Sequence, residues 1–266
     1  MLGYVRLYSP RAKETIRGIL EKHLDRYQVT RYTDNILTCV DELVKNGIKA
    51  NYKYVLIREK LEQLIAEGKI NQSADEILKD RKTYSDVTEE HINLEDITKV
   101  VREALTQEAK VITLKSKANK EERKYTDEER QKILDLKTLL NLQKKTKKYK
   151  ARVELRINEY WNALNIEVMN NAPILERDLG RLHQKRKEFK EFADRGEEMM
   201  FFINNMDTQD AGAGLGYATI DSGLREMGLD PFQTINIISV SNTTVLIYFK
   251  LDKLKELMAE QPSAAE

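Results

Sequence analysis

Residues 33–51 constrain the fold most, because their apolar and polar side chains separate with the period of a helix. Thr33 or Asp34 would cap its start. The apolar face carries Ile36, Val40, Val44, Gly47 and Ile48, and the opposite face carries Thr38, Glu42, Lys45, Asn46 and Lys49. Carboxylate, carboxamide and ammonium groups in this order suit a divalent metal and phosphate oxygens. A helix with an ordinary polar solvent face would show the same pattern.

Composition narrows the class of protein. The 266 residues are 33% charged and 41% hydrophobic with a net charge of +1, which is typical of a globular chain of one large or two small domains. The balanced charge makes nucleic acid an unlikely partner. No apolar run approaches the roughly 20 residues of a membrane span, so we expect no membrane partner. The single cysteine, Cys39, cannot form an internal disulfide, which favours a reducing, cytoplasmic location and a buried thiol.

A second candidate binding segment lies near the C-terminus. Gly212, Gly214 and Gly216 alternate with Ala213 and Leu215 directly before an expected helix. Glycines at such a position leave backbone N–H groups free to face an anion at the helix N-terminus. This spacing alone is a weak signal, since many loops contain three glycines.

Together the two segments resemble the GHKL ATPases, the superfamily that includes histidine kinases and anti-sigma-factor serine kinases. Residues 42–50, Glu-Leu-Val-Lys-Asn-Gly-Ile-Lys-Ala, resemble the N-box of that superfamily, and residues 212–216 resemble its glycine box. The resemblance implies that Asn46 holds Mg²⁺, that Glu42 positions the reacting water or hydroxyl, and that Lys49 reaches the phosphates of ATP. Gly212, Gly214, Leu215 and Gly216 would cradle those phosphates, and Thr243 would lie near the nucleotide.

The adenine-binding segment departs from the family pattern. Where the superfamily has Asp-x-Gly-x-Gly, this chain has Asn170-Asn171-Ala172-Pro173-Ile174. A carboxamide both donates and accepts hydrogen bonds, so Asn170 or Asn171 can face an amine or a carbonyl on the base. We therefore expect weaker discrimination between ATP and GTP than the family shows.

A long helical stretch separates the two matching parts. Residues 52–150 show helical patterns at 55–67, after Ser73, at 94–115 and at 126–148, and two apolar stripes within them predict a helical hairpin. They end in a basic run at Lys144, Lys145, Lys147, Lys148 and Lys150. That run would suit an acidic partner or nucleic acid, but a solvated helix end explains it more simply.

The predicted fold class is an α/β (α+β) sandwich. A mixed, mostly antiparallel sheet carries helices on one face, and a helical subdomain is inserted. Residues 1–51 and 151–258 would form the ATP-binding domain, residues 52–150 the insertion, and residues 259–266 a flexible tail.

Three functions fit these observations. The first is a nucleotide-binding, histidine-kinase-like ATPase or kinase in signalling, which needs ATP and Mg²⁺ and positions groups rather than forming covalent bonds. The second is a catalytically degenerate descendant that binds a protein partner through residues 52–150. The third is a structural domain whose glycine segment is only a loop.

Overall fold

The computed structural model describes residues 2–5, 8–206 and 215–260. Its sheet contains β1 Leu2–Val5, β2 Val153–Tyr160, β3 Ala163–Asn170, β4 Ile235–Ser239 and β5 Thr243–Lys250. The strand order is β1-β2-β3-β5-β4, and all four described strand pairs are antiparallel. The α+β fold with a helical insertion is thus confirmed, and the described strand pairs contain none of the parallel pairing that a mixed sheet would need.

The helices fall into a body and an insertion. Those of the body are α1 Pro10–Asp25, the 3-10 turn η1 Thr30–Tyr32, α2 Thr33–Ala66, α8 Glu176–Asp194, α9 Glu198–Met206, α10 Leu215–Glu226, α11 Pro231–Thr234 and α12 Leu251–Glu260. Those of the insertion are α3 Ala74–Lys79, α4 Arg81–His91, α5 Leu94–Lys120, α6 Asp127–Leu134 and α7 Lys137–Lys148. Within the described residues, no helix combines the length and apolar character needed to cross a membrane.

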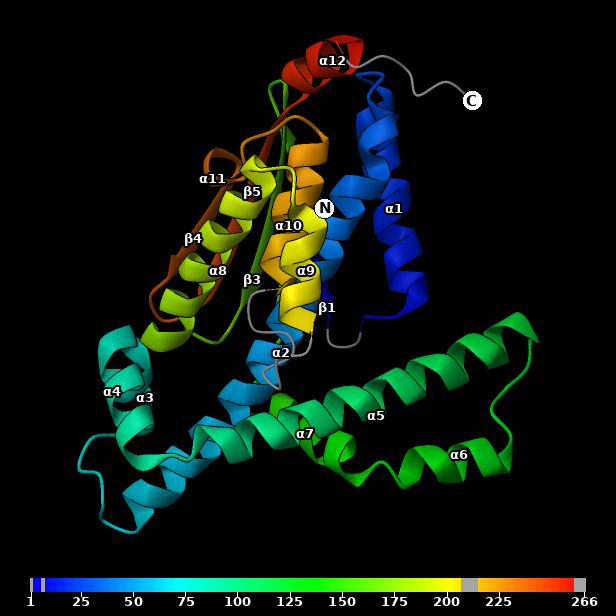
Figure 1. Cartoon of the computed structure of the whole chain (residues 1–266). Coiled ribbons are helices and arrows are strands. Elements are labelled where there is room, and N and C mark those ends of the chain that lie inside the picture. The colour runs from blue at the N-terminus through cyan, green and yellow to red at the C-terminus, as the bar shows by residue number, and fades with distance from the viewer. Residues whose placement is uncertain (1, 6–7, 207–214, 261–266) are drawn as a thin grey trace.

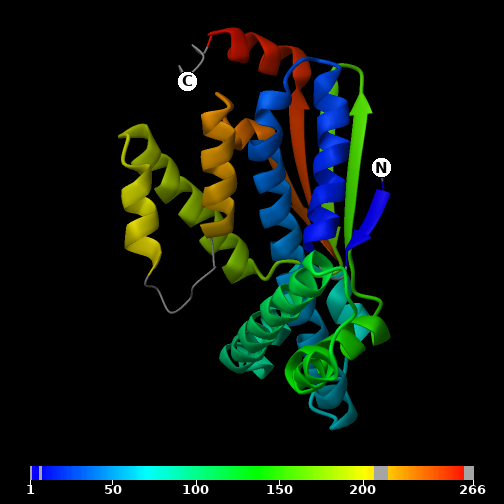
Figure 2. The same ribbon diagram turned by 90° about the vertical axis from the view of Figure 1, so that its right-hand side faces the viewer.

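One face of the sheet is covered by a layer of helices. α1, α2 and α10 stand side by side over the strands, and α8 and α9 lie beyond α10 (Figure 2). The alternate residues Leu155, Ile157, Ile166 and Ile247 of the strands are buried under this layer. Cys39 of α2 is fully buried there, and burial raises the pKa of its thiol to about 12, so it serves as a small core residue.

Gly47 allows α2 to lie close to the sheet. A Cβ atom at this position would come within 3.0 Å of Cγ2 of Val153 on β2 and 3.6 Å of Cβ of Asn170 on β3. Val153 is fully buried and its neighbours restrict its movement. The glycine of the N-box-like segment therefore sets the distance between α2 and the strands β2 and β3.

Helix α2 is longer than we expected. The prediction ended one helix near Asn51 and began another at Val55, but a single helix continues to Ala66. No glycine or proline interrupts residues 48–67, and Gly68, where φ is +71°, follows the C-cap residue of the helix. The expected domain boundary at residue 51 thus falls within α2, and one hydrophobic core continues from the body into the insertion.

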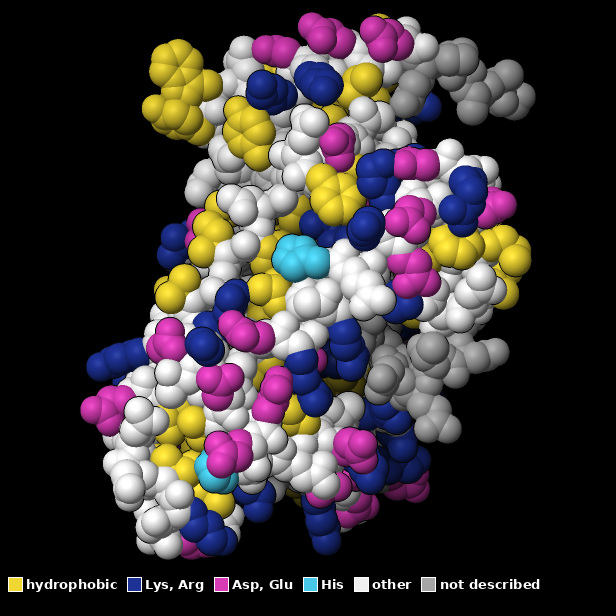
Figure 3. All heavy atoms as spheres, turned by 60° about the vertical axis from the view of Figure 1, so that its left-hand side comes forward, with side chains coloured by type: hydrophobic (Ala, Val, Ile, Leu, Met, Phe, Trp, Pro, Cys, Tyr) yellow, Lys and Arg dark blue, Asp and Glu magenta, His cyan; other side chains and the backbone are white. Residues whose placement is uncertain are grey.

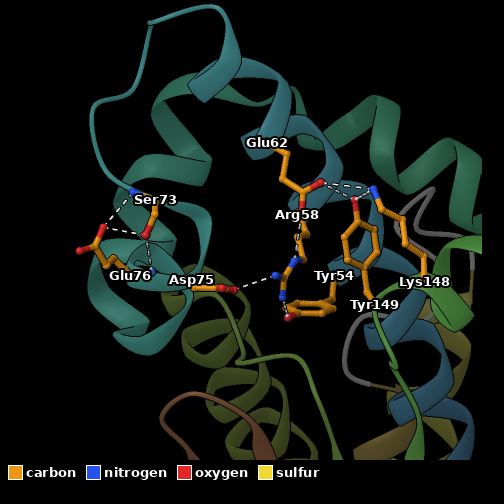
Figure 4. A network of polar contacts seen from close by, with 8 residues as sticks. All are labelled: Tyr54, Arg58, Glu62, Ser73, Asp75, Glu76, Lys148 and Tyr149. Carbon is orange, nitrogen blue, oxygen red and sulfur yellow. Dashed lines mark hydrogen bonds and ion pairs between the residues drawn. The ribbon is translucent and has the colours of Figure 1, made fainter.

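The second half of α2 is held by a polar network (Figure 4). Arg58 donates to the hydroxyl of Tyr54 at 3.1 Å and to Asp75 of α3 at 2.7 Å. Glu62 accepts from the hydroxyl of Tyr149, which follows α7, at 2.7 Å. The same helix that carries the N-box-like residues is therefore fastened to both the start and the end of the insertion.

The insertion leaves and rejoins the body at neighbouring points. The backbone N–H of Asn171 donates to Oδ1 of Asn51, and its own Oδ1 accepts from the backbone N–H of Arg152. Between these points, α5 packs against α7, which is the helical pairing that the apolar stripes predicted, and also against α2 (Figure 1). The helix expected at 126–148 is divided into α6 and α7. Capping boxes at Ser73 and Thr126 begin α3 and α6.

Candidate functional site

A cavity of about 650 Å³ lies where α2, the strand ends, α5 and α8 meet. Its floor is formed by Val168 and Asn170 of β3, by residues 172–175, and by Thr243 and Val245 of β5. Asn46, Lys49 and Lys53 of α2 line one wall, residues of α5 and Tyr84 of α4 line another, and α8 lines a third. A second hollow of about 480 Å³, lined by charged residues of α1 and the start of α2, includes none of the predicted site residues.

Five of the predicted site residues line this one cavity. They come from four separate segments, and they are Asn46, Lys49, Asn170, Gly216 and Thr243. Asn46 and Lys49 are partly buried, and Asn170 and Thr243 are buried. The two segments that the sequence analysis identified, more than 160 residues apart along the chain, thus face the same space.

Glu42 and Asn46 converge on the first turn of α10. A Cβ atom added to Gly216 would lie 3.0 Å from Nδ2 of Asn46, 3.4 Å from its Oδ1 and 3.1 Å from Oε2 of Glu42. The other carboxylate oxygen of Glu42 accepts from Lys45 at 2.8 Å. A glycine at position 216 therefore lets the first turn of α10 lie close to the side chains of Glu42 and Asn46 on α2. Any larger residue would displace these two side chains.

Asn170 and Thr243 are oriented by a shared acceptor. Nδ2 of Asn170 donates to the carbonyl oxygen of Ala172 at 3.1 Å, and the Thr243 hydroxyl donates to the same oxygen at 2.6 Å. With Nδ2 engaged in this way, the Asn170 carboxamide can offer its acceptor Oδ1 to a ligand. The side chain of Asn171 instead accepts from the backbone of Arg152, and Asn171 is absent from the described cavity wall.

The structure describes part of the glycine segment. Gly212 and Gly214 lie outside the described residues. Leu215 begins α10 and packs against a small aromatic cluster that includes Phe189 and Phe201, so its side chain has a packing role. Of Leu215 and Gly216, the two predicted residues of this segment that the structure describes, Gly216 lines the cavity.

The cavity wall has an excess of positive charge. Among the described residues it includes six basic side chains, which are Lys49, Lys53, Lys99, Arg102, Arg177 and Arg181. It includes two acidic side chains, Glu95 and Asp178, and Asp178 forms an ion pair with Lys53. On the face shown in Figure 3, Lys and Arg side chains gather around a hollow where α8 meets the insertion. Such a surface attracts an anion.

The sequence analysis missed most of these cations. Lys53 follows Lys49 by one helical turn on the same face, so its position was detectable from spacing. Arg102 of α5 and Arg177 and Arg181 of α8 reach the cavity only through the packing of distant helices. No local pattern distinguishes them from other exposed basic residues.

Lys49 shows the effect of this crowding of charge. Its ammonium group is partly buried, and burial together with the nearby charge of Lys53 lowers its pKa below the usual value. Arg102 and Arg181 act in the same direction, and Asp178 opposes them. A partly buried cation surrounded mainly by other cations is a site where an anionic ligand would be stabilised.

We expect Lys49→Met to stabilise the ligand-free protein by about 0.5–1 kcal/mol. Because the pKa is lowered on folding, the unfolded state binds more protons between the folded pKa and the usual lysine value. The charged side chain therefore opposes folding at neutral pH, and the advantage of the variant should shrink as pH rises through that interval. Urea unfolding at several pH values measures it, with Lys60→Met on the exposed face of α2 as the matched control. Equal stability of wild type and Lys49→Met at neutral pH would contradict the expectation.

The residues present fit a metal that is carried by a nucleotide. Within the described part of the chain, no group of three His, Cys, Asp or Glu side chains forms a metal cage. Mg²⁺ bound with a nucleotide takes one or two protein oxygens in addition to phosphate oxygens and waters. Oδ1 of Asn46, which lies beside Gly216, could supply one such oxygen.

Comparisons with known proteins add no assignment. No family model matches the chain, and neither the curated proteins nor the solved structures compared with it include a match. The residues of the cavity and the resemblance in sequence are therefore the features that bear on function.

Proposed function

We propose that the chain is a cytoplasmic ATP-binding domain of the GHKL type that acts as a kinase or ATPase in signalling. The observation that supports it best is the meeting of Asn46, Lys49, Asn170, Gly216 and Thr243 in one cavity. Those residues were singled out from sequence segments that are distant along the chain. The excess of basic side chains around the cavity also supports the proposal. So does Gly216, which lets α10 lie close to Asn46 and Glu42.

In this proposal each wall of the cavity has its own task. Asn46 holds Mg²⁺, and Mg²⁺ neutralises charge on the phosphates when it is bound. Lys49 contacts phosphate oxygens, Asn170 and Thr243 lie beside the base, and Glu42 accepts a proton from the attacking water or hydroxyl. Phosphoryl transfer requires mainly alignment and charge neutralisation, and these side chains can provide both.

The orientation of Asn170 changes our expectation for base selectivity. Because Nδ2 donates to Ala172, Oδ1 would meet the adenine amine favourably but would face the carbonyl oxygen of guanine. We now expect ATP to be bound about tenfold to a hundredfold more tightly than GTP. This ratio corresponds to the free-energy cost of one unsatisfied polar contact. Competition of the two nucleotides for the protein measures the ratio. Equal affinities would show that Oδ1 does not contact the base.

Asn46→Ala should weaken Mg-ATP binding by at least about tenfold, the loss expected for a metal ligand or a charge-assisted contact. The side chain faces the cavity, so the free energy of unfolding should change little. Titration calorimetry measures binding, and Asn119→Ala on the exposed surface of α5 is the matched control. If Mg-ATP binds equally to wild type and Asn46→Ala, Asn46 is not the metal ligand.

The alternative is a degenerate relative that acts as a protein-interaction module through residues 52–150. It predicts that purified wild type neither hydrolyses ATP nor transfers its phosphate. Calorimetry with Mg-ATP followed by an assay for phosphate release and self-phosphorylation separates the two proposals.

A further inference from the structure

The insertion forms part of the cavity wall. Thr98, Lys99 and Arg102, all on the first turns of α5, line it opposite Lys49 and Lys53 of α2. Two turns beyond Arg102, α5 is attached to α2 by a 3.2 Å hydrogen bond from the Tyr52 hydroxyl to Glu108. Both Tyr52 and Glu108 are buried. One end of a long helix of the insertion thus contacts the candidate ligand site, and the rest extends away from the body (Figure 1).

The insertion also positions a second wall of the cavity. The residue that precedes α8, Leu175, provides no side-chain cap, but the hydroxyl of Ser85 on α4 accepts from the backbone N–H of Glu176 at 2.9 Å. Ser85 therefore caps α8 from another segment. Arg177 and Arg181 lie within the first two turns of the capped helix and line the cavity. The cavity is thus built jointly by the body and the insertion.

Like charges meet across this joint. Arg102 belongs to the insertion and Lys49 to α2, and they are close enough for Arg102 to contribute to the lowered pKa of Lys49. Two cations on separate walls repel each other. A polyphosphate placed between them would attract both, so it would pull the two walls together.

We propose that Arg102 contacts the phosphates of the bound nucleotide opposite Lys49, so that nucleotide binding draws α5 of the insertion onto α2. The inference rests on the proposed function and adds to it a phosphate-binding residue and a route by which the insertion senses the nucleotide. Arg102 and Lys49 line the cavity from the helices α5 and α2, whereas the candidate base contacts Asn170 and Thr243 lie on the strands. A guanidinium can hold two phosphate oxygens at once, which suits this position.

The test compares Arg102→Ala and Arg102→Lys with wild type in the full chain. Arg102→Ala should bind Mg-ATP about tenfold more weakly, the effect of losing one charge-assisted contact, and Arg102→Lys should recover part of that loss. Binding of adenosine, measured by competition, should stay unchanged. Lys110→Ala, an exposed position on the same helix, is the matched control and should bind like wild type.

Amide hydrogen exchange tests the movement of α5. Mg-ATP should slow exchange in residues 94–105 of wild type, and at saturating Mg-ATP it should slow exchange less in Arg102→Ala. Wild-type binding with no effect of Arg102→Ala on affinity or exchange would overturn the inference and leave the proposed function standing. If Arg102→Ala weakened the binding of adenosine and of Mg-ATP equally, the inference would also be overturned. Arg102 would then maintain the shape of the cavity and would not contact the phosphates. Absence of Mg-ATP binding in wild type would refute the proposed function, and the inference with it.

Discussion

Glu42→Gln should leave Mg-ATP bound while slowing hydrolysis or phosphoryl transfer by about 10²–10⁴-fold, the usual contribution of a positioned general base. Glutamine keeps the size and shape of the side chain but cannot accept the proton. The carboxylate is about a quarter exposed, at 23%, so a reacting water can reach it. Lys45 engages one oxygen, and the other lies beside Asn46 at the Gly216 backbone.

The neighbouring carboxylate, Asp41, provides a test of this assignment. Asp41 is buried and forms contacts with the Tyr8 hydroxyl and with Lys13 of α1, so its bonds fasten α1 to α2. Asp41→Asn should therefore lower stability more than turnover. Glu14→Gln, at an exposed position of α1, controls for the loss of one negative charge.

The assay measures phosphate release and self-phosphorylation at saturating Mg-ATP. If Glu42→Gln turns over as fast as wild type while Asn46→Ala is impaired, the proton acceptor is another group. Wild type that binds Mg-ATP without any turnover would instead favour the degenerate relative.

The parts of the fold that were predictable depend on local patterns. The amphipathic start of α2, the cap at Ser9-Pro10 and the alternating strands β2 and β3 follow from short-range periodicity and capping chemistry. The expected end of this helix at residue 51 was wrong, because the core that α2 shares with the insertion continues the helix to Ala66. Helix α12 was not predicted either. Its contacts with β3 and β5 are long-range packing that local sequence patterns do not show.

The candidate site was predictable only where its residues belong to recognisable segments. Asn46, Lys49 and Gly216 come from such segments, and the structure places them around one cavity. Arg102 and Arg181 come from helices whose positions depend on long-range packing, so the sequence carries no local signal for them. The carboxamide of Asn171 was a reasonable candidate from its position, but its hydrogen bond with Arg152 is a tertiary feature.

Asp221→Ala should reduce the free energy of unfolding by about 3–5 kcal/mol, the effect of leaving a buried partner charge unpaired. Asp221 of α10 accepts two hydrogen bonds of 2.8 Å from Arg186 of α8. The side chains are only 2% and 4% exposed. Arg186 also donates to the carbonyl of Pro231 at 3.1 Å and lies over the ring of Phe232, so it cannot move to water without breaking those contacts.

An exposed pair on the same two helices provides the matched control. Arg225 of α10 and Asp194 of α8 are 3.1 Å apart, with 29% and 46% of their side chains exposed. Asp194→Ala should change stability far less than Asp221→Ala, because water screens and replaces the interaction. Urea unfolding of both variants measures the difference, and a cost for Asp221→Ala as small as that for Asp194→Ala would contradict the role of burial.

A double replacement separates the pair from the packing around it. Arg186→Met combined with Asp221→Leu removes both charges and fills a similar volume, so most of the lost stability should return. The pair joins the helix that carries Arg177 and Arg181 to the helix that begins at Leu215 and Gly216. If its role is to align these two walls, the double variant should also retain Mg-ATP binding close to that of wild type, whereas Asp221→Ala should lose binding and stability together. Recovery of stability without recovery of binding would mean that the buried charges themselves, and not only the alignment of α8 and α10, act on the nucleotide site.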